Sequence, residues 1–211
     1  MTNAAEKVNA ISETGGWCPK ETNVTQLKDR RHWIDRKLIA ALSIFFKDKY
    51  VGSFGDGSGQ YKQLLLNYDT LKGYDAFDGG PFCETTTNGF VKYLDLTIPQ
   101  YGLRLYDWIL CLEVAEHIPR KFEGVFIDNI VRHAHEGVVL SWAKLGQHGQ
   151  GHVNNRPFEY VKDLMRTFGF AHSIMESQHL KNATEIVWLN WNVNVFRRQK
   201  MILAEDMKMY T

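Results

Sequence analysis

The stretch YVGSFGDGSGQY, residues 50–61, places three glycines at alternate positions directly behind a short apolar run. Glycine is used where φ must be positive or where another group must approach the backbone closely. A plain tight turn and a cradle for a ligand both fit that description. The segments on either side of the stretch decide which of the two is the better prediction.

Short apolar runs and amphipathic segments alternate around the glycines. The apolar runs, each bounded by turn residues, predict strands at 50–54, 74–77, 91–96, 106–112 and 137–143. Apolar residues at helical spacing predict helices at 27–49, 61–68, 122–134 and 157–169. This alternation indicates an α/β fold: a Rossmann-like, doubly wound sheet that is mostly parallel and has helices on both faces.

The C-terminal part of the chain changes this pattern. Residues 171–177 and 185–198 have strand-like sequences, and we expect them to form a hairpin that adds an antiparallel C-terminal strand to the sheet. Residues 1–25 are polar and are predicted to be a flexible arm. One domain is therefore expected over residues 26–200, followed by a tail at 201–211.

Charge and cysteine usage exclude several classes of protein. The formal net charge of +1 gives no general electrostatic footprint for nucleic acid or an anionic membrane. The sequence has no apolar run of membrane-spanning length. Cys18, Cys83 and Cys111 are widely spaced, with neither metal-ligand spacing nor a disulfide framework, which favours a reducing compartment. We expect a cytoplasmic protein that binds neither nucleic acid nor a membrane.

The predicted order of elements places the glycines in the first strand-to-helix turn. In a doubly wound sheet, a nucleotide-like ligand meets backbone amides at that turn. The spacing is G-x-G-x-G and not the dinucleotide fingerprint G-x-G-x-x-G. Asp78 ends the next predicted strand, where a carboxylate accepts hydrogen bonds from both hydroxyls of a ribose. The alternative is a plain turn followed by a solvated Asp78.

Four motifs in this order resemble the class I S-adenosylmethionine-dependent methyltransferases. They are the glycines after the first strand, the acid after the second, LDL at 94–96, and YDWILCLEVAEHIP at 106–119. The last is similar to the EVxEH motif of many small-molecule methyltransferases. The loop GQHGQGHVN at 146–154 resembles a compact subgroup, some of whose members are associated with glycan assembly. The resemblance extends from about residue 32 to residue 198.

This resemblance implies S-adenosylmethionine as cofactor and S-adenosylhomocysteine as product. The implied cofactor-binding residues are Gly55, Asp56, Gly57, Gly59, Asp78, Gly79, Asp95, Leu96 and Glu113. Asp95 would accept from the adenine amine; a helix N-cap or turn residue is the alternative. The family usually has an acid two residues before the first glycine, and this chain has Ser53 there. We expect Asp56 to share the task of that acid, which is to organise the glycine turn.

Two histidines are candidate catalytic residues. Methyl transfer is a direct displacement at carbon, so the enzyme must align the reactants and remove the acceptor's proton. His117 in the EVAEH segment and His152 in the glycine-rich loop are the predicted bases, because imidazole titrates near neutral pH. The alternative for His117 is that it caps or packs the start of a helix.

The loop after the fifth predicted strand is expected to bind the acceptor. It is polar and glycine-hinged, and the predicted acceptor-binding residues are Trp142, His148, Asn154 and Arg156. Histidines are ligand types for first-row metals. However, no acidic cluster lies near these histidines in the sequence, so no metal is expected.

The expected function is therefore S-adenosylmethionine-dependent O-methylation of a small polar acceptor, such as a sugar or glycan. N-methylation of a small molecule is one alternative. A non-catalytic partner subunit that keeps the fold is a second, favoured only by Ser53. An NAD-dependent oxidoreductase is a third, and the glycine spacing counts against it.

Overall fold

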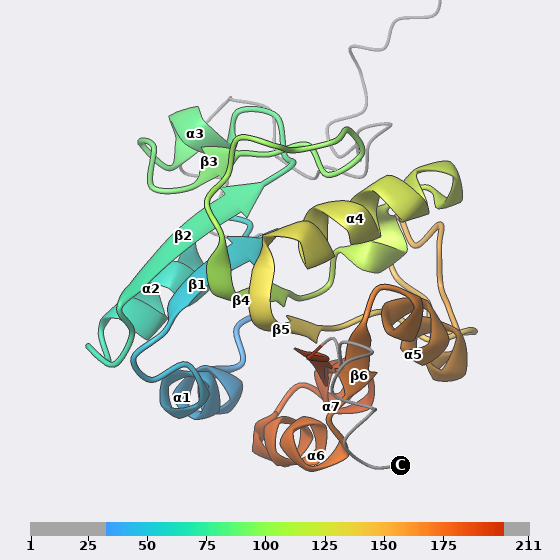
Figure 1. Cartoon of the computed structure of the whole chain (residues 1–211). Helices are drawn as coiled ribbons and strands as arrows, with labels where there is room; N and C mark the ends of the chain where they lie inside the picture. The colour runs from blue at the N-terminus through green and yellow to red at the C-terminus, as the bar shows by residue number, and fades with distance from the viewer. Residues whose placement is uncertain (1–32, 201–211) are drawn as a thin grey trace, which may run out of the picture.

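The computed structural model describes residues 33–200, which form a seven-stranded sheet in the order β3-β2-β1-β4-β5-β7-β6 (Figure 1). The strands are β1 (Tyr50–Phe54), β2 (Gly73–Asp78), β3 (Lys92–Tyr93), β4 (Tyr106–Cys111), β5 (Ala134–Leu140), β6 (Phe170–His172) and β7 (Asn194–Arg198). Strands β1 to β5 are parallel, whereas β7 is antiparallel to both of its neighbours, β5 and β6. The predicted fold class is confirmed. The predicted arm and tail lie outside the described residues.

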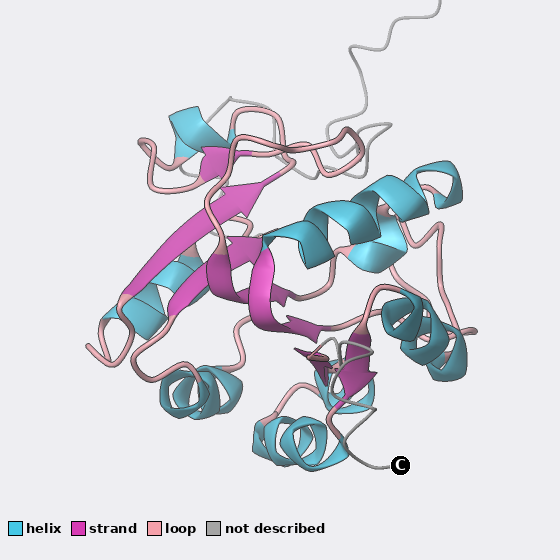
Figure 2. Ribbon diagram, in the orientation of Figure 1, coloured by secondary structure: helices cyan, strands magenta, loops and turns pink. Residues whose placement is uncertain are grey.

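Helices cover both faces of this sheet (Figure 2). They are α1 (Arg36–Phe45), α2 (Gln60–Leu66), α3 (Cys83–Thr86), α4 (Glu123–His133), α5 (Phe158–Thr167), α6 (Ile174–Ala183) and α7 (Val187–Asn192). The 3₁₀ turns η2 (Ala115–His117) and η3 (Arg120–Phe122) follow β4. Apolar side chains of α4 and α5 pack on one face, and those of α1, α2, α6 and α7 pack on the other.

Strand β4 shows why the central strands are continuous apolar runs in the sequence. Ile109 belongs to the core on the α4 side, and Trp108 and Leu110 belong to the core on the α1 side. All three side chains are at most 1% exposed. Both faces of a parallel sheet are covered by helices. Successive residues of a central strand therefore pack into two different cores, and these three are all apolar.

The strand order reverses between β1 and β4. From β1 the chain moves outward to β2 and β3, then returns to β4 on the opposite side of β1. At such a switch point, the connections leaving neighbouring strands diverge and open a crevice at their carboxyl ends. The turns after β1 and β4 are therefore placed to line a binding site.

The C-terminal hairpin is predicted correctly in its pairing and wrongly in its connection. Strands β6 and β7 do pair antiparallel, but α6 and α7 lie between them. Residues 174–177 belong to helix α6 and residues 187–192 to helix α7, so neither part is strand. A long-range contact supports this helix, because Asp35 Oδ2 accepts from the backbone N–H groups of Glu185 and Ile186 at 2.7 and 2.9 Å.

Strand β3 is shorter than predicted. It pairs with β2 only at Lys92 and Tyr93, after which the Leu94 N–H donates to the Asp78 carbonyl at 2.9 Å. Leu94 and Leu96 are buried, so the apolar pattern that predicted a longer strand reflects burial in a loop.

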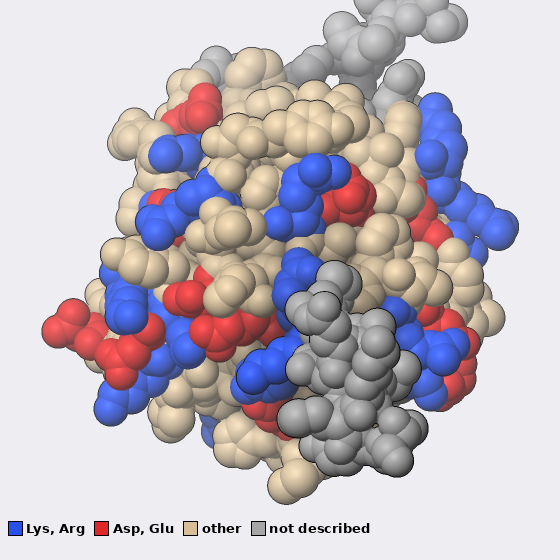
Figure 3. Space-filling view, in the orientation of Figure 1, with Lys and Arg blue, Asp and Glu red and all other residues tan. Residues whose placement is uncertain are grey.

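The described surface fits the near-neutral composition. Figure 3 shows Lys and Arg interspersed with Asp and Glu on the face in view, without a single basic stripe. No helix within residues 33–200 is long and apolar enough to cross a membrane. Cys83 and Cys111 are buried, and Cys18 lies outside the described residues.

Candidate functional site

A cavity of about 770 Å³ lies where the strand order predicts a crevice. It is lined by the turn after β1, the end of β2, the segment after β3 and the turn after β4. Residues of the loop 146–152 and of α7 complete its wall. A volume of this size suits a cofactor together with a small acceptor.

The turn after β1 needs glycine both for its positive φ angles and for the close approach of neighbouring groups to its backbone. Gly55, Gly57 and Gly59 have φ of 99°, 60° and 81°, in the left-handed region that favours glycine. A Cβ on Gly55 would lie 2.1 Å from Val114 Cγ2, and one on Gly59 would lie 2.8 Å from Phe90 Cδ1. Gly55 and Gly57 line the cavity, whereas Gly59 lies outside its lining, at the start of α2.

Asp78 joins the end of β2 to the glycine turn. Its Oδ2 accepts from the Gly57 N–H at 2.8 Å, and its Oδ1 accepts from the Gly80 N–H at 2.7 Å. Asp78 and Gly79 both line the cavity. The carboxylate is therefore oriented by backbone amides, and its role toward a ribose stays a prediction.

Asp56 lies beside the serine that replaces the usual acid. Asp56 Oδ1 accepts from Ser53 Oγ at 2.8 Å and from the Tyr74 hydroxyl at 2.9 Å. Burial raises the pKa of Asp56 to about 6, although these hydrogen bonds oppose the shift. The Asp56 carboxyl thus ties the first strand-to-helix turn to Ser53 of β1 and to Tyr74 of β2.

Asp95 acts as a turn residue, which is the alternative role considered for it in the sequence. Its Oδ1 accepts from the N–H and the hydroxyl of Thr97, at 2.8 and 2.7 Å. Asp95 and its neighbour Leu96 nevertheless line the cavity. The turn role and a cofactor contact are compatible at this position.

The backbone after β4 is held in a strained conformation next to the end of β5. Glu113 has φ of 57°, which is uncommon for a residue with a side chain. Its N–H donates to Ser141 Oγ, and that hydroxyl donates to Glu113 Oε1, both at 2.7 Å. Burial raises the pKa of the Glu113 carboxyl, and the hydrogen bond from Ser141 opposes this. Strain of this kind gathers at functional sites.

Glu116 is the least expected residue of the site. Its side chain is 0% exposed, and neither Oε1 nor Oε2 has a hydrogen-bond partner among residues 33–200. Burial, and secondarily the charge of Glu113, raises the pKa of Glu116 well above its usual value. The backbone N–H groups of Glu116 and Ala143 act in the opposite direction, although neither reaches hydrogen-bond geometry with the carboxyl. Buried polar groups are almost always hydrogen-bonded, so two unpartnered oxygens on one carboxyl need an explanation.

The two predicted bases lie next to each other. The rings of His117 and His152 meet edge to face, with centroids 5.2 Å apart. His117 Nδ1 lies 3.1 Å from the Gly151 carbonyl, and His152 Nδ1 lies 3.2 Å from the Gln147 carbonyl. A carbonyl only accepts, so each Nδ1 carries a proton and each neutral ring keeps its lone pair on Nε2. Burial lowers the pKa of His117, which favours this neutral form.

Most of the predicted acceptor-binding residues do not line the cavity. The Trp142 indole is buried and donates to the Asn154 carbonyl at 2.6 Å. The side chains of Asn154 and Arg156 donate to Glu123 Oε2 at 2.9 and 2.6 Å. Glu123 is a buried acid at the start of α4, and it uses these two side chains as partners. His148 is the one predicted acceptor-binding residue that lines the cavity.

Three aromatic residues of the wall were not predicted to bind the acceptor. Trp188 and Trp191 come from α7, and Trp33 packs edge to face on Trp188 with ring centroids 5.5 Å apart. Lys144 Nζ lies 3.9 Å from the centroid of the Trp191 ring. The i, i+3 spacing of the two α7 tryptophans places them on one face of the helix. This spacing is visible in the sequence, but the prediction of a strand for this segment misses it.

No protein-family model and no curated protein matches this sequence. Solved structures do match the fold. CalS10, an amino pentose methyltransferase of Micromonospora echinaspora solved with S-adenosylmethionine bound, has a TM-score of 0.63 at 10% identity; the match covers 85% of this chain and 98% of CalS10.

Two further structures agree. Magnesium protoporphyrin IX methyltransferase of Synechocystis PCC 6803, solved with bound S-adenosylhomocysteine, gives a TM-score of 0.56 at 14% identity, over 78% of this chain and 83% of that one. An O-methyltransferase family protein of Burkholderia thailandensis gives 0.54 at 11% identity, over 78% of this chain and 56% of that one. The chain therefore has the class I methyltransferase fold, as expected. The narrower resemblance of the EVAEH segment and the loop 146–154 stays a prediction.

Proposed function

We propose that this protein is an S-adenosylmethionine-dependent methyltransferase that methylates a hydroxyl group of a small polar acceptor, such as a sugar. The observation that carries the proposal is one cavity whose lining combines two chemically different sets of residues. Gly55, Gly57 and Asp78 form the first set, which we call the glycine end, and His117 and His152 form the second, which we call the histidine end. The first set suits a nucleoside-containing cofactor, and the second suits removal of a proton from a hydroxyl.

The glycine end of the cavity fits the cofactor. Gly55 and Gly57 line the cavity with positive φ, so a ligand there meets main chain that carries no side chain. Asp78, fixed by two amides, would hold the ribose hydroxyls, and Asp95 would hold the adenine amine. S-adenosylmethionine would supply an activated methyl group when bound. CalS10 was solved with this cofactor bound, and its fold is shared.

The histidine end must align the acceptor and accept its proton. A neutral hydroxyl is a poor nucleophile, and a group positioned to remove its proton contributes about 10²–10⁴-fold. His117 and His152 each keep an Nε2 lone pair, because their Nδ1 atoms are used by backbone carbonyls. Both residues line the cavity, so this task falls to them.

The wall formed by α7 and the loop 146–152 suits a polar ring. Trp188 and Trp191 offer apolar faces, while Gln147 and His148 offer polar groups. Aromatic platforms combined with a few polar groups are a common way to fix the orientation of a small ligand. The acceptor would lie against this wall with its hydroxyl directed toward the two histidines.

Calorimetric titration with S-adenosylmethionine, S-adenosylhomocysteine and NAD is the first test. We expect saturable binding of the first two and no binding of NAD. Transfer of a labelled methyl group to a panel of sugars and simple amines then separates O- from N-methylation. Absence of binding at millimolar S-adenosylmethionine would overturn the proposal. Binding of the cofactor without transfer to any acceptor would favour a non-catalytic partner subunit.

A further inference from the structure

The unpartnered carboxyl of Glu116 points to a ligand that the sequence alone does not suggest. A buried carboxyl without a hydrogen bond is costly, whether it is charged or neutral. Glu116 itself is not among the residues that line the cavity, but its carboxyl lies beside His117 and His152, which do line it. One ligand atom from each of these three residues lies within 4.8 Å of the other two.

The arrangement of the two imidazoles matches that of metal-bound histidines. A histidine that binds a metal usually donates its other ring N–H to a backbone carbonyl or carboxylate, which fixes the tautomer and the ring orientation. The carbonyls of Gly151 and Gln147 accept from the Nδ1 atoms of His117 and His152. Both Nε2 atoms are thereby prepared as ligands.

The distances leave room for an ion. Metal–nitrogen and metal–oxygen bonds are about 2.0–2.2 Å, so ligands on opposite sides of one ion are about 4 Å apart. Ligand atoms within 4.8 Å of one another close on an ion with small side-chain rotations. Glu113, which also lines the cavity, lies on the same turn as Glu116. Two neighbouring carboxylates would offset the charge of a divalent cation.

We propose that Glu116, His117 and His152 bind a divalent first-row transition ion at the histidine end of the cavity. A mixed imidazole and carboxylate set suits Mn²⁺, Fe²⁺, Co²⁺ or Zn²⁺ better than Mg²⁺ or Ca²⁺, which prefer oxygen ligands alone. The sequence predicts no metal, because no acidic cluster lies near His148 and His152 in the loop. The acid comes instead from the turn after β4.

This inference deepens the proposed function and rests on it for the role of the ion, and it replaces direct removal of the proton by an imidazole with removal assisted by the ion. A divalent cation polarises a hydroxyl that it binds and lowers the pKa of that hydroxyl. The two imidazoles would then promote loss of the acceptor's proton through the ion and not as bases, and the proton would pass to solvent.

The test measures metal binding in the absence of cofactor and acceptor. Chelator-treated protein is titrated with Mn²⁺, followed by calorimetry and electron paramagnetic resonance, and with Co²⁺, followed by visible absorption. We expect saturation at about one ion per chain, with a Co²⁺ spectrum that reports nitrogen ligands. Glu116→Gln and His152→Ala should each weaken Mn²⁺ binding at least about 10-fold. Thermal melts of both variants verify that they fold.

Matched controls come from a second cluster, Asp107, His135 and Glu136, which satisfies the same distance criterion. His135→Ala and Glu136→Gln should leave Mn²⁺ affinity unchanged. Absence of saturable Mn²⁺ binding in protein that binds S-adenosylmethionine would overturn the metal site and leave the methyltransferase proposal standing. Saturable Mn²⁺ binding in protein that does not bind S-adenosylmethionine would support the metal site and overturn the methyltransferase proposal. Preference for Mg²⁺ over Mn²⁺ would overturn the assignment of the two imidazoles as ligands.

Discussion

Two clusters of acids and histidines lie at opposite ends of the same pair of strands, and only one of them contributes residues, His117 and His152, to the lining of the 770 Å³ cavity. Asp107, His135 and Glu136 are at the amino-terminal ends of β4 and β5. Glu116 and His117 follow the carboxyl end of β4, and His152 lies in the loop after β5. In both clusters, the candidate ligand atoms lie within 4.8 Å of one another.

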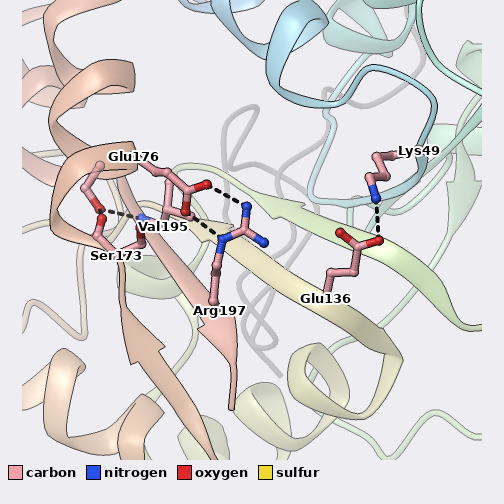
Figure 4. A network of polar contacts seen from close by, with 7 residues as sticks. Lys49, Glu136, Ser173, Glu176, Val195 and Arg197 are labelled. Atoms are coloured by element: carbon pink, nitrogen blue, oxygen red, sulfur yellow. Dashed lines mark hydrogen bonds and ion pairs between the residues drawn. The ribbon is translucent and has the colours of Figure 1, made fainter. Parts of the chain in front are cut away.

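The partners of the acids separate the two clusters. Asp107 Oδ2 accepts from the Tyr50 N–H at 2.8 Å, and Glu136 Oε1 pairs with Lys49 Nζ at 2.5 Å (Figure 4). At this end of the sheet, Asp107 and Glu136 therefore have partners within the fold. Glu116 is buried without such a partner, on the side where the strand order opens a crevice. Residue types alone do not indicate a ligand site. A buried carboxyl that lacks a hydrogen-bond partner, beside residues that line a cavity, does indicate one.

The largest expected effect is on turnover. His117→Gln and His152→Gln should each lower the rate of methyl transfer by about 10²–10⁴-fold, because either change removes an imidazole from the residues that line the cavity. His135→Gln, at the other end of β5, should leave the rate unchanged. Initial rates and cofactor affinity are measured side by side, and affinity should change little in all three variants.

Chelation separates two ways in which these histidines could act. If the wild-type rate falls on treatment with EDTA and returns with Mn²⁺, the histidines act through an ion. A rate that is insensitive to EDTA, combined with slow His117→Gln and His152→Gln variants, would show that an imidazole removes the proton directly. Full rates in both variants would remove the functional difference between the two clusters.

The second effect concerns the cofactor. Asp78→Ala should weaken S-adenosylmethionine binding by about 10–150-fold, the equivalent of roughly 1.5–3 kcal/mol for one hydrogen bond to a charged group. Asp107→Ala is the control, since its carboxylate lies at the opposite end of the sheet and contacts the Tyr50 amide. Calorimetry gives both affinities. Equal affinities for wild type and Asp78→Ala would make Asp78 a turn residue only.

The sequence predicts the central strands well because their signals are local. The predicted strand at 50–54 coincides with β1, and the one at 106–112 exceeds β4 by a single residue. The one predicted at 137–143 starts and ends three residues after β5. Each is an apolar run of the length that a strand needs, ended by turn residues. The glycine turn follows from the same local logic, since positive φ and close approach both require glycine.

What the sequence does not predict depends on contacts between distant residues. Helix α7 is supported by Asp35, about 150 residues earlier in the chain. The Arg156 side chain donates to Glu123 of α4, so it does not line the predicted acceptor site. The Glu116 carboxyl looks like any other acid in the motif, and only the packing around it shows that its oxygens have no partner. Composition and spacing carry none of this information.

The third effect uses an acid that is buried and also has partners. The pKa of Asp56 is raised to about 6, so the folded state binds a proton that the unfolded chain releases near pH 4. Its contribution to stability is therefore fully present below about pH 4 and is lost as the pH rises to about 6. Asp56→Asn should remove this loss of roughly 2–3 kcal/mol.

Urea unfolding of wild type and Asp56→Asn between pH 4 and 7 tests this prediction. Asp163→Asn is the control, because this carboxylate pairs with Arg166 on the exposed face of α5. Identical pH profiles for wild type and Asp56→Asn would mean that Ser53 and Tyr74 offset the burial of Asp56 completely.

The smallest effect tests the comparison most directly, because the two clusters should respond with opposite signs. Glu116→Leu replaces an unpartnered buried carboxyl by an apolar side chain of similar size, so chelator-treated protein should gain roughly 1–2 kcal/mol of stability. Glu136→Leu breaks a partly exposed ion pair with Lys49 and should cost about 0–1 kcal/mol. Urea unfolding without metal measures both changes. Added Mn²⁺ should then stabilise the wild type and Glu136→Leu but not Glu116→Leu, because only a protein that binds the ion is stabilised by it. If Glu116→Leu is instead less stable than wild type without metal, the Glu116 carboxyl already has a stabilising partner in the fold, and the difference between the two clusters disappears.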